Sequence, residues 1–182
     1  MSNNTNNKKT TNASTTDNAE TLIEFDNVHF SYPTRPDAPV FEGLNLQVKK
    51  GETLALVGAS GCGKSTTIQL IECFYHPSQG TIRYKGLDLK QTNVRWLRDE
   101  LGLVSQQPTL FDCTIEENIK YGMPHATHDQ VVEAAKQANA HGFVTEFTDG
   151  YDTRVGPGST LISGGQKQRI CIARALLKKP KV

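Results

Sequence analysis

The sequence has little of what would place it across a membrane, in a secretory route or on nucleic acid. No apolar run approaches the roughly 18 residues of a membrane-spanning helix, and the N-terminus lacks the apolar core of a secretory signal. Lysine and arginine number 20 and aspartate and glutamate 19, so no basic field favours nucleic acid as a partner. The 182 residues therefore predict a chain that is soluble as written and has the length of about one domain.

Cysteine is also scarce, and its spacing excludes two kinds of site. The four cysteines lie too far apart for a C-x-x-C metal or redox motif. Cys62 lies inside a glycine-rich stretch where a disulfide would block a ligand, which favours a reducing, cytosolic setting.

The first 20 residues have few apolar side chains, and eleven of them are Asn or Thr. Such a segment cannot bury enough surface to offset its chain entropy, so residues 1–20 are predicted to be a disordered tail. We expect the folded part to span residues 21–182.

The most informative stretch is a glycine-rich loop between an apolar run at 54–57 and a helical pattern that starts near residue 64. It has the form G-x-x-x-x-G-K-[ST] and consists of Gly58, Ala59, Ser60, Gly61, Cys62, Gly63, Lys64 and Ser65, followed by Thr66. The glycines would let backbone amides point at phosphate oxygens, and the helix start adds its positive end. Lys64 would reach the β- and γ-phosphates of a nucleotide and Ser65 would ligate Mg²⁺. The alternative is a glycine turn that only joins a strand to a helix.

A second stretch lies about a hundred residues downstream, at residues 161–169, and precedes another helical run. Ser163 and Gln166 have the spacing of a capping box, which by itself indicates only a well-formed helix start. Gly164 and Gly165 lie at the mouth of that helix, so the same residues also suit an exposed anion site. The two interpretations are compatible.

Together, the two motifs resemble the phosphate loop and the signature sequence of ATP-binding cassette (ABC) proteins. The resemblance implies ATP and Mg²⁺ as ligands and a head-to-tail dimer with a second ABC nucleotide-binding domain. In that dimer Ser163, Gly164, Gly165 and Gln166 would face the ATP held by the partner. The similarity covers residues 25–182. The stretches that resemble the multidrug-exporter, P-glycoprotein-like branch are SYPTRPDAPVF, VRWLRDELGLVSQ, TIEENIKYG and ISGGQKQRICIARALL.

The implied fold is α/β: a P-loop NTPase of the ABC type, with an antiparallel β subdomain and a helical subdomain, incomplete at its C-terminus. The helical subdomain is expected over 111–158 and the signature at 162–166. Apolar periodicity predicts strands near 23–30 (with a local irregularity), 44–48, 54–57, 81–84 and 103–105, and a helix over 94–101. Two further capping boxes are predicted at Thr114 with Glu117 and at Thr127 with Gln130.

Two other residues take roles from the resemblance. Tyr32, in FSYP, matches the aromatic residue that stacks on adenine, although a Tyr beside Pro33 is otherwise a surface turn residue. Gln106 matches the glutamine that contacts Mg²⁺ and the attacking water, with Gln107 as the second choice. The alternative for both glutamines is a polar turn before Pro108.

The sequence departs from the family in three places. Ile162 stands where the signature usually has Leu, and the segment 154–159, with Pro157, replaces one that in exporters usually carries an acidic residue and contacts the membrane domain. The chain also stops at Val182, before the strand that in the family carries the Mg²⁺-linked Asp and the catalytic Glu, and before the switch His. We therefore expect this chain to hydrolyse ATP poorly or not at all, and residues 54–57 to face an unpaired sheet edge.

The leading hypothesis is the ATP-driven motor of an exporter. It would lie at the cytoplasmic face of a membrane, on transmembrane domains that are fused or separate. The alternative is a soluble, non-transport ABC protein or a non-catalytic nucleotide-binding module. A GTPase is disfavoured because no N-K-x-D motif is present, and a kinase because the second motif has no purpose in one. The cargo cannot be read from this part of a transporter.

Overall fold

The computed structural model describes residues 20–182, which divide into two compact units. One unit contains residues up to 71 together with 75–91, and the other contains 72–74 and 92–182. Apart from Glu20, the Asn/Thr-rich tail that the sequence predicts to be disordered lies outside the described residues.

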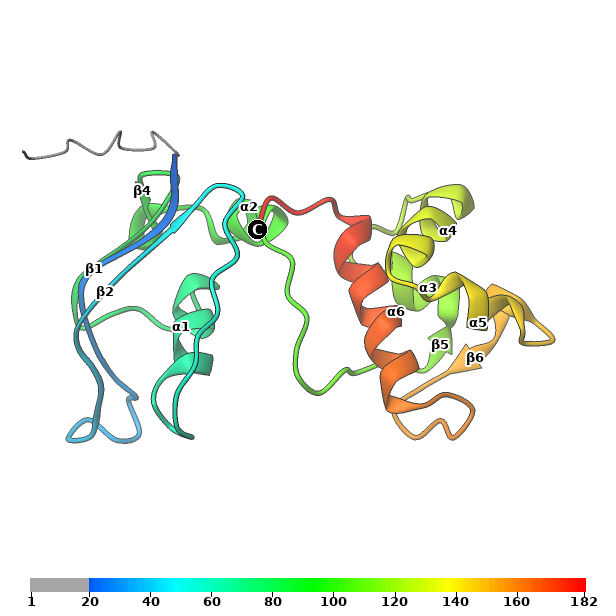
Figure 1. Cartoon of the computed structure of the whole chain (residues 1–182), viewed down its shortest axis with the longest axis horizontal. Helices are drawn as coiled ribbons and strands as arrows, with labels where there is room; N and C mark the ends of the chain where they lie inside the picture. The colour runs from blue at the N-terminus through cyan, green and yellow to red at the C-terminus, as the bar shows by residue number, and fades with distance from the viewer. Residues whose placement is uncertain (1–19) are drawn as a thin grey trace, which may run out of the picture. The chain divides into compact units, whose positions relative to one another are not determined.

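The first unit is built on an antiparallel sheet with strand order β2-β1-β3-β4 (Figure 1). Its strands are β1 (Thr21–Ser31), β2 (Pro39–Lys49), β3 (Gln79–Tyr84) and β4 (Leu87–Asp88). The alternation of β1 breaks where the sequence predicts an irregularity: its register shifts between Phe25 and Val28, and Asn27 has a φ of 48°. This bulge returns Val28 and Phe30 to the buried face, so the apolar set of β1 stays on one side of the sheet.

The sheet packs against the helix that follows the glycine loop. This helix, α1 (Lys64–Ile71), buries Thr66, Thr67 and Leu70, and a short 3₁₀ turn, η1 (Leu89–Gln91), adds Leu89. The buried apolar residues of this unit are Leu22, Ile23, Phe25, Val28, Phe30, Phe41, Leu70, Ile82, Tyr84 and Leu89.

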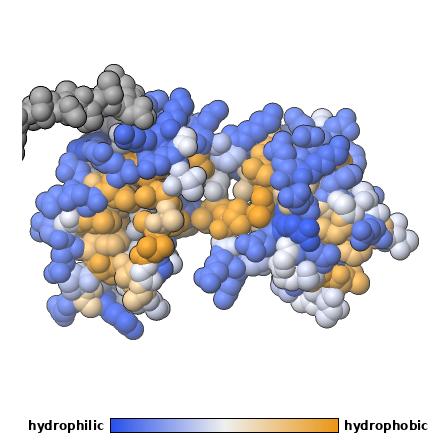
Figure 2. Space-filling model, in the orientation of Figure 1, coloured by the Kyte–Doolittle hydropathy of each residue, from blue (hydrophilic) through white to orange (hydrophobic). Residues whose placement is uncertain are grey.

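Two predicted strands are wrong. Residues 53–58 and 101–105 form no strand, because no strand in the described part of the chain pairs with either segment and a strand needs a hydrogen-bonded neighbour. Leu54 and Val57 are consequently 40% and 88% exposed. Figure 2 shows hydrophobic side chains open to view on this unit, in the region of α1 and the segment before it.

The second unit is mainly helical and contains a small two-stranded sheet (Figure 1). Its elements are α2 (Val94–Glu100), β5 (Cys113–Thr114), α3 (Ile115–Lys120), α4 (His128–Gln137), α5 (His141–Thr145), η2 (Gly150–Asp152), β6 (Arg154–Val155) and α6 (Gly164–Leu177). Helices α3 and α4 both pack on α6, around Ile119, Val131 and Ile170, which are fully buried. The core continues through Leu110, Ile115, Val144, Val155 and Leu177.

The three predicted capping boxes are confirmed. Thr114 with Glu117 opens α3, Thr127 with Gln130 opens α4, and Ser163 with Gln166 opens α6. In each box the hydroxyl accepts from the third backbone amide, and the third side chain accepts from the amide of the cap residue. In residues 20–182 there is no helix with the length and apolar character to cross a bilayer.

Candidate functional site

The glycine-rich loop leads from an extended segment directly into α1, which begins at Lys64. Gly61 and Gly63 have φ angles of +84° and +95°. These left-handed values cost glycine little and strain other residues. The two glycines therefore allow the chain to reverse so sharply that the helix starts within the loop motif itself.

Gly63 meets a second constraint. A Cβ at Gly63 would lie 2.4 Å from Cε1 of Phe41, a buried ring of β2, whereas a Cβ at Gly61 would meet nothing within 4 Å. Gly61 is thus required for its backbone angle alone. At Gly63, the missing side chain also lets the loop approach the sheet closely.

The side chain of Lys64 folds back onto the loop. Its Nζ donates to the carbonyl oxygens of Gly58 and Ala59, each at 2.8 Å, and lies 3.5 Å from Sγ of Cys62. In the described part of the chain, the amides of the loop and helix start that donate to no protein acceptor include those of Gly61, Gly63, Lys64 and Ser65. Free amides at a turn and a helix start, beside an ammonium group, form an anion-binding arrangement.

Tyr32 lies directly after β1 and reaches α1. Its hydroxyl is 2.8 Å from Oγ1 of Thr66 and donates to Oε1 of Gln69, also at 2.8 Å. Its ring makes edge contacts with Phe30 and Tyr75, at centroid distances of 5.1 and 5.3 Å. The half-buried ring is therefore fixed at both ends beside the glycine loop, and is not a loose turn residue.

The predicted site residues of the second unit are exposed, except Gln166, which is half-buried. Gln106 and Gln107 lie in the irregular segment between α2 and β5, where Ser105 Oγ donates to the Gln107 carbonyl oxygen at 2.8 Å. At the start of α6, Ser163 accepts from the amide of Gln166 at 3.2 Å. A Cβ added to the two glycines between them would meet nothing within 4 Å, so the mouth of this helix is open.

The structure thus brings together the predicted residues of the first unit: the loop from Gly58 to Thr66, and Tyr32. Gln106 and the motif at 163–166 belong to the second unit. Phe41 behind Gly63, and Gln69 bonded to Tyr32, were missed by sequence reasoning. They lie 22 and 37 residues from the groups they contact, and no local pattern marks them.

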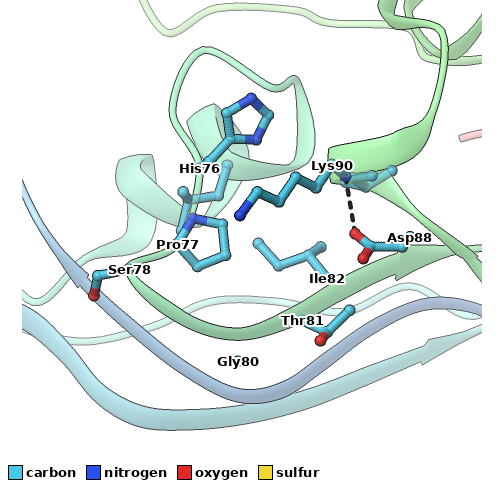
Figure 3. A pocket seen from close by; sticks show the side chains of 10 residues that line it. His76, Pro77, Ser78, Gly80, Thr81, Ile82, Asp88 and Lys90 are labelled. Atoms are coloured by element: carbon cyan, nitrogen blue, oxygen red, sulfur yellow. Dashed lines mark hydrogen bonds between the residues drawn. The ribbon is translucent and has the colours of Figure 1, made fainter.

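One small, partly open pocket of the first unit lies away from the loop. Its volume is about 70 Å³, and Figure 3 shows the side chains that line it, which include His76, Pro77, Ile82 and Lys90. It is far smaller than a typical cofactor site of roughly 300–1,000 Å³, so the glycine loop remains the candidate site. Over residues 20–182, no three His, Cys, Asp or Glu side chains gather as metal ligands.

Comparisons with known proteins agree with this description. Residues 41–182 match the ABC transporter family. The chain is 53% identical over 163 residues to Multidrug resistance protein 3 of Entamoeba histolytica, and 55% identical over 160 residues to ABC transporter B family member 2 of Dictyostelium discoideum. Each match covers 88% of this chain and 12% of the relative. A solved structure of a bacterial Atm1-family ABC exporter with ATP bound aligns with a TM-score of 0.82 and 42% identity, over 90% of this chain and 28% of that one.

The chain belongs to the ABC transporter family, and its fold is that of an ABC-type ATPase domain. It spans about 12% of the length of the curated relatives named above. Within the family it is a nucleotide-binding domain homologous to those of multidrug and B-family exporters.

Proposed function

We propose that the loop from Gly58 to Thr66 binds the phosphates of ATP with Mg²⁺, and that Tyr32 receives the adenine ring. The observation that carries the proposal is the arrangement at Lys64, whose ammonium is held on two carbonyl oxygens of a loop that also has unpartnered amides. Lys64 leaves its two carbonyl partners and turns to the β- and γ-phosphates when nucleotide binds. Ser65 supplies a hydroxyl ligand to the metal ion, and Gln106 contacts the metal and the attacking water.

The test is isothermal titration of the 182-residue chain with ATP in the presence of Mg²⁺. Lys64→Ala removes the ammonium and should weaken binding at least tenfold, since a charge-assisted hydrogen bond contributes about 1.5–3 kcal/mol. Lys90→Ala is the matched control, because it removes a lysine of the same unit that lies outside the loop. Equal affinities for the parent chain, Lys64→Ala and Lys90→Ala would refute the assignment.

The motif at 163–166 has a separate proposed role. The exposed N-terminus of α6 faces the ATP held by a second ABC nucleotide-binding domain in a head-to-tail dimer. This dimer powers export through transmembrane domains. The names of the relatives as multidrug resistance proteins and as an exporter support this role. The dimer is tested by sedimentation with and without ATP: Gly164→Glu should abolish ATP-dependent association, because it puts a carboxylate where the partner's phosphates would lie. Gly142→Glu, an exposed glycine at another helix start, is the control.

A further inference from the structure

The hydroxyl of Tyr32 takes part in a short chain of hydrogen bonds that ends on α1. A phenol has one hydrogen to donate, and it is directed to Oε1 of Gln69. The contact with Thr66 Oγ1 is then one in which Thr66 donates to the Tyr32 oxygen. Thr66 is only 5% exposed, so its hydroxyl has little water to compete for it.

Gln69 is the outer end of this chain. It lies one turn after Ser65 on α1, the helix whose first turn belongs to the glycine loop. Its carboxamide is thus attached to the element that positions the phosphate site, and it holds the ring at the end of β1. Phe30 and Tyr75 contact the Tyr32 ring in T-shaped geometry, whereas its hydroxyl end contacts Thr66 and Gln69.

We propose that Gln69 is a positioning residue for base recognition, because it orients the Tyr32 ring relative to the phosphate loop through the ring's hydroxyl. This inference rests on the proposed binding of ATP. It goes further by assigning to Gln69 a role in selecting a nucleotide over a bare polyphosphate. Gln69 touches neither base nor phosphate and acts only through Tyr32.

The expected effect follows from the chemistry of the bond. A neutral hydrogen bond of this kind contributes about 0.5–1.5 kcal/mol, so losing it should weaken ATP binding about two- to tenfold. Tripolyphosphate has no base and makes no use of the ring. The affinity for tripolyphosphate should therefore be unchanged when the hydrogen bond is lost. The ratio of the affinities for ATP and tripolyphosphate then separates an effect on ring orientation from an effect on the loop.

The experiment titrates the 182-residue chain with Mg²⁺-ATP and, separately, with Mg²⁺-tripolyphosphate. Gln69→Met keeps the size and helix preference of the side chain but removes the acceptor, whereas Gln69→Glu keeps an acceptor. We expect Gln69→Met to lower the ATP-to-tripolyphosphate ratio two- to tenfold, and Gln69→Glu to restore it. Gln91→Met, an exposed glutamine of the same unit, should leave the ratio unchanged.

A double substitution separates positioning from a general change in structure. Tyr32→Phe removes the bond to Gln69 together with the bond to Thr66, so Tyr32→Phe with Gln69→Met should weaken ATP binding no more than Tyr32→Phe alone. Additive losses would overturn the proposal, as would an unchanged ratio in Gln69→Met while the parent chain binds both ligands. If the parent chain bound neither ATP nor tripolyphosphate, the proposed nucleotide function itself would fail, which is a different outcome.

Discussion

At the scale of single residues, Gly63 and Asn118 contribute more to the stability of the fold than the residues beside them in the sequence suggest. Gly63 allows close packing of the loop on Phe41. Asn118, fully buried on α3, accepts from the amide of Phe111 and from Arg174 through Oδ1, and donates through Nδ2 to the carbonyls of Phe111 and Thr114. The close contact of Gly63 and the hydrogen bonds of Asn118 form only in the folded chain, so substitution at either position should lower stability.

The two loop glycines should respond differently to alanine. Gly61→Ala should lower the free energy of unfolding by about 1–2 kcal/mol, because alanine is strained in the left-handed backbone conformation of this position. Gly63→Ala should lower the free energy of unfolding by about 1–3 kcal/mol more than Gly61→Ala does, since its Cβ would meet the Phe41 ring. Urea unfolding followed by circular dichroism measures both. Equal losses would show that the contact with Phe41 does not constrain the loop.

Asn118→Asp should destabilise the second unit by about 1–3 kcal/mol at neutral pH. The change is nearly isosteric, but it replaces an amide donor with an oxygen that faces the carbonyls of Phe111 and Thr114. Asn93→Asp is the control, because the Oδ1 that caps α2 is retained in aspartate. The midpoints of chemical unfolding of the two variants give the comparison. If Asn118→Asp lost as little stability as the control, the hydrogen bonds assigned to Asn118 would be contradicted.

At the scale of elements, a carboxylate connects two successive helices, α3 and α4. Glu116 on α3 bonds to Lys120 one turn later and to Nδ1 of His128 on α4, both at 2.6 Å. Burial acts to raise the pKa of Glu116, but the hydrogen bonds and charges of Lys120 and His128 outweigh it, so the pKa lies below its usual range. Burial also raises the pKa of the neighbouring Tyr151, with a further contribution from Glu116.

The lowered pKa of Glu116 gives a signed prediction. A carboxyl whose pKa is lower in the folded state stabilises the fold above its unfolded pKa, and this contribution disappears as the pH falls through the folded pKa. Glu116→Gln should therefore lower the thermal midpoint at pH 7, and the difference from the parent chain should shrink on acidification below about pH 4. Glu146→Gln changes an exposed carboxylate at the end of α5 and serves as the control. A difference that stays constant from pH 7 to pH 3 would contradict the ion pair.

At the scale of the whole molecule, each unit has its own apolar core. The core of the helical unit packs on α6. Its residues come from positions between 110 and 177, so the core forms only when distant segments meet. Ile170 contributes from α6 and is fully buried. The packing of this helix also sets where its N-terminal motif is presented.

Ile170→Ala should destabilise the second unit by about 2–5 kcal/mol, the usual cost of removing a large buried side chain. Leu161→Ala is the matched control, since Leu161 is 63% exposed and should change stability by less than about 0.5 kcal/mol. Urea denaturation curves of the two variants give the comparison. A similar small shift in both would mean that α6 is not part of a packed core.

The local features of this protein could be predicted from the order of its residues. The three capping boxes and the loop-to-helix transition follow from short-range rules, because a cap involves residues only a few positions apart. The irregularity of β1 could be read from the break in its own apolar alternation. The phosphate-loop motif could likewise be read from residue types at fixed spacing, since the backbone turn and the helix start are encoded within eight residues.

Tertiary structure decided what depends on partners far along the chain. The segments at 54–57 and 103–105 have the apolar character of strands, yet a strand exists only where a neighbour completes its hydrogen bonds, and none does so among residues 20–182. The contact of Gly63 with Phe41 and the bond from Tyr32 to Gln69 are equally invisible in the sequence, because they join positions 22 and 37 residues apart. The motif could be read from the sequence, but the groups that hold it in place could be identified only from the folded chain.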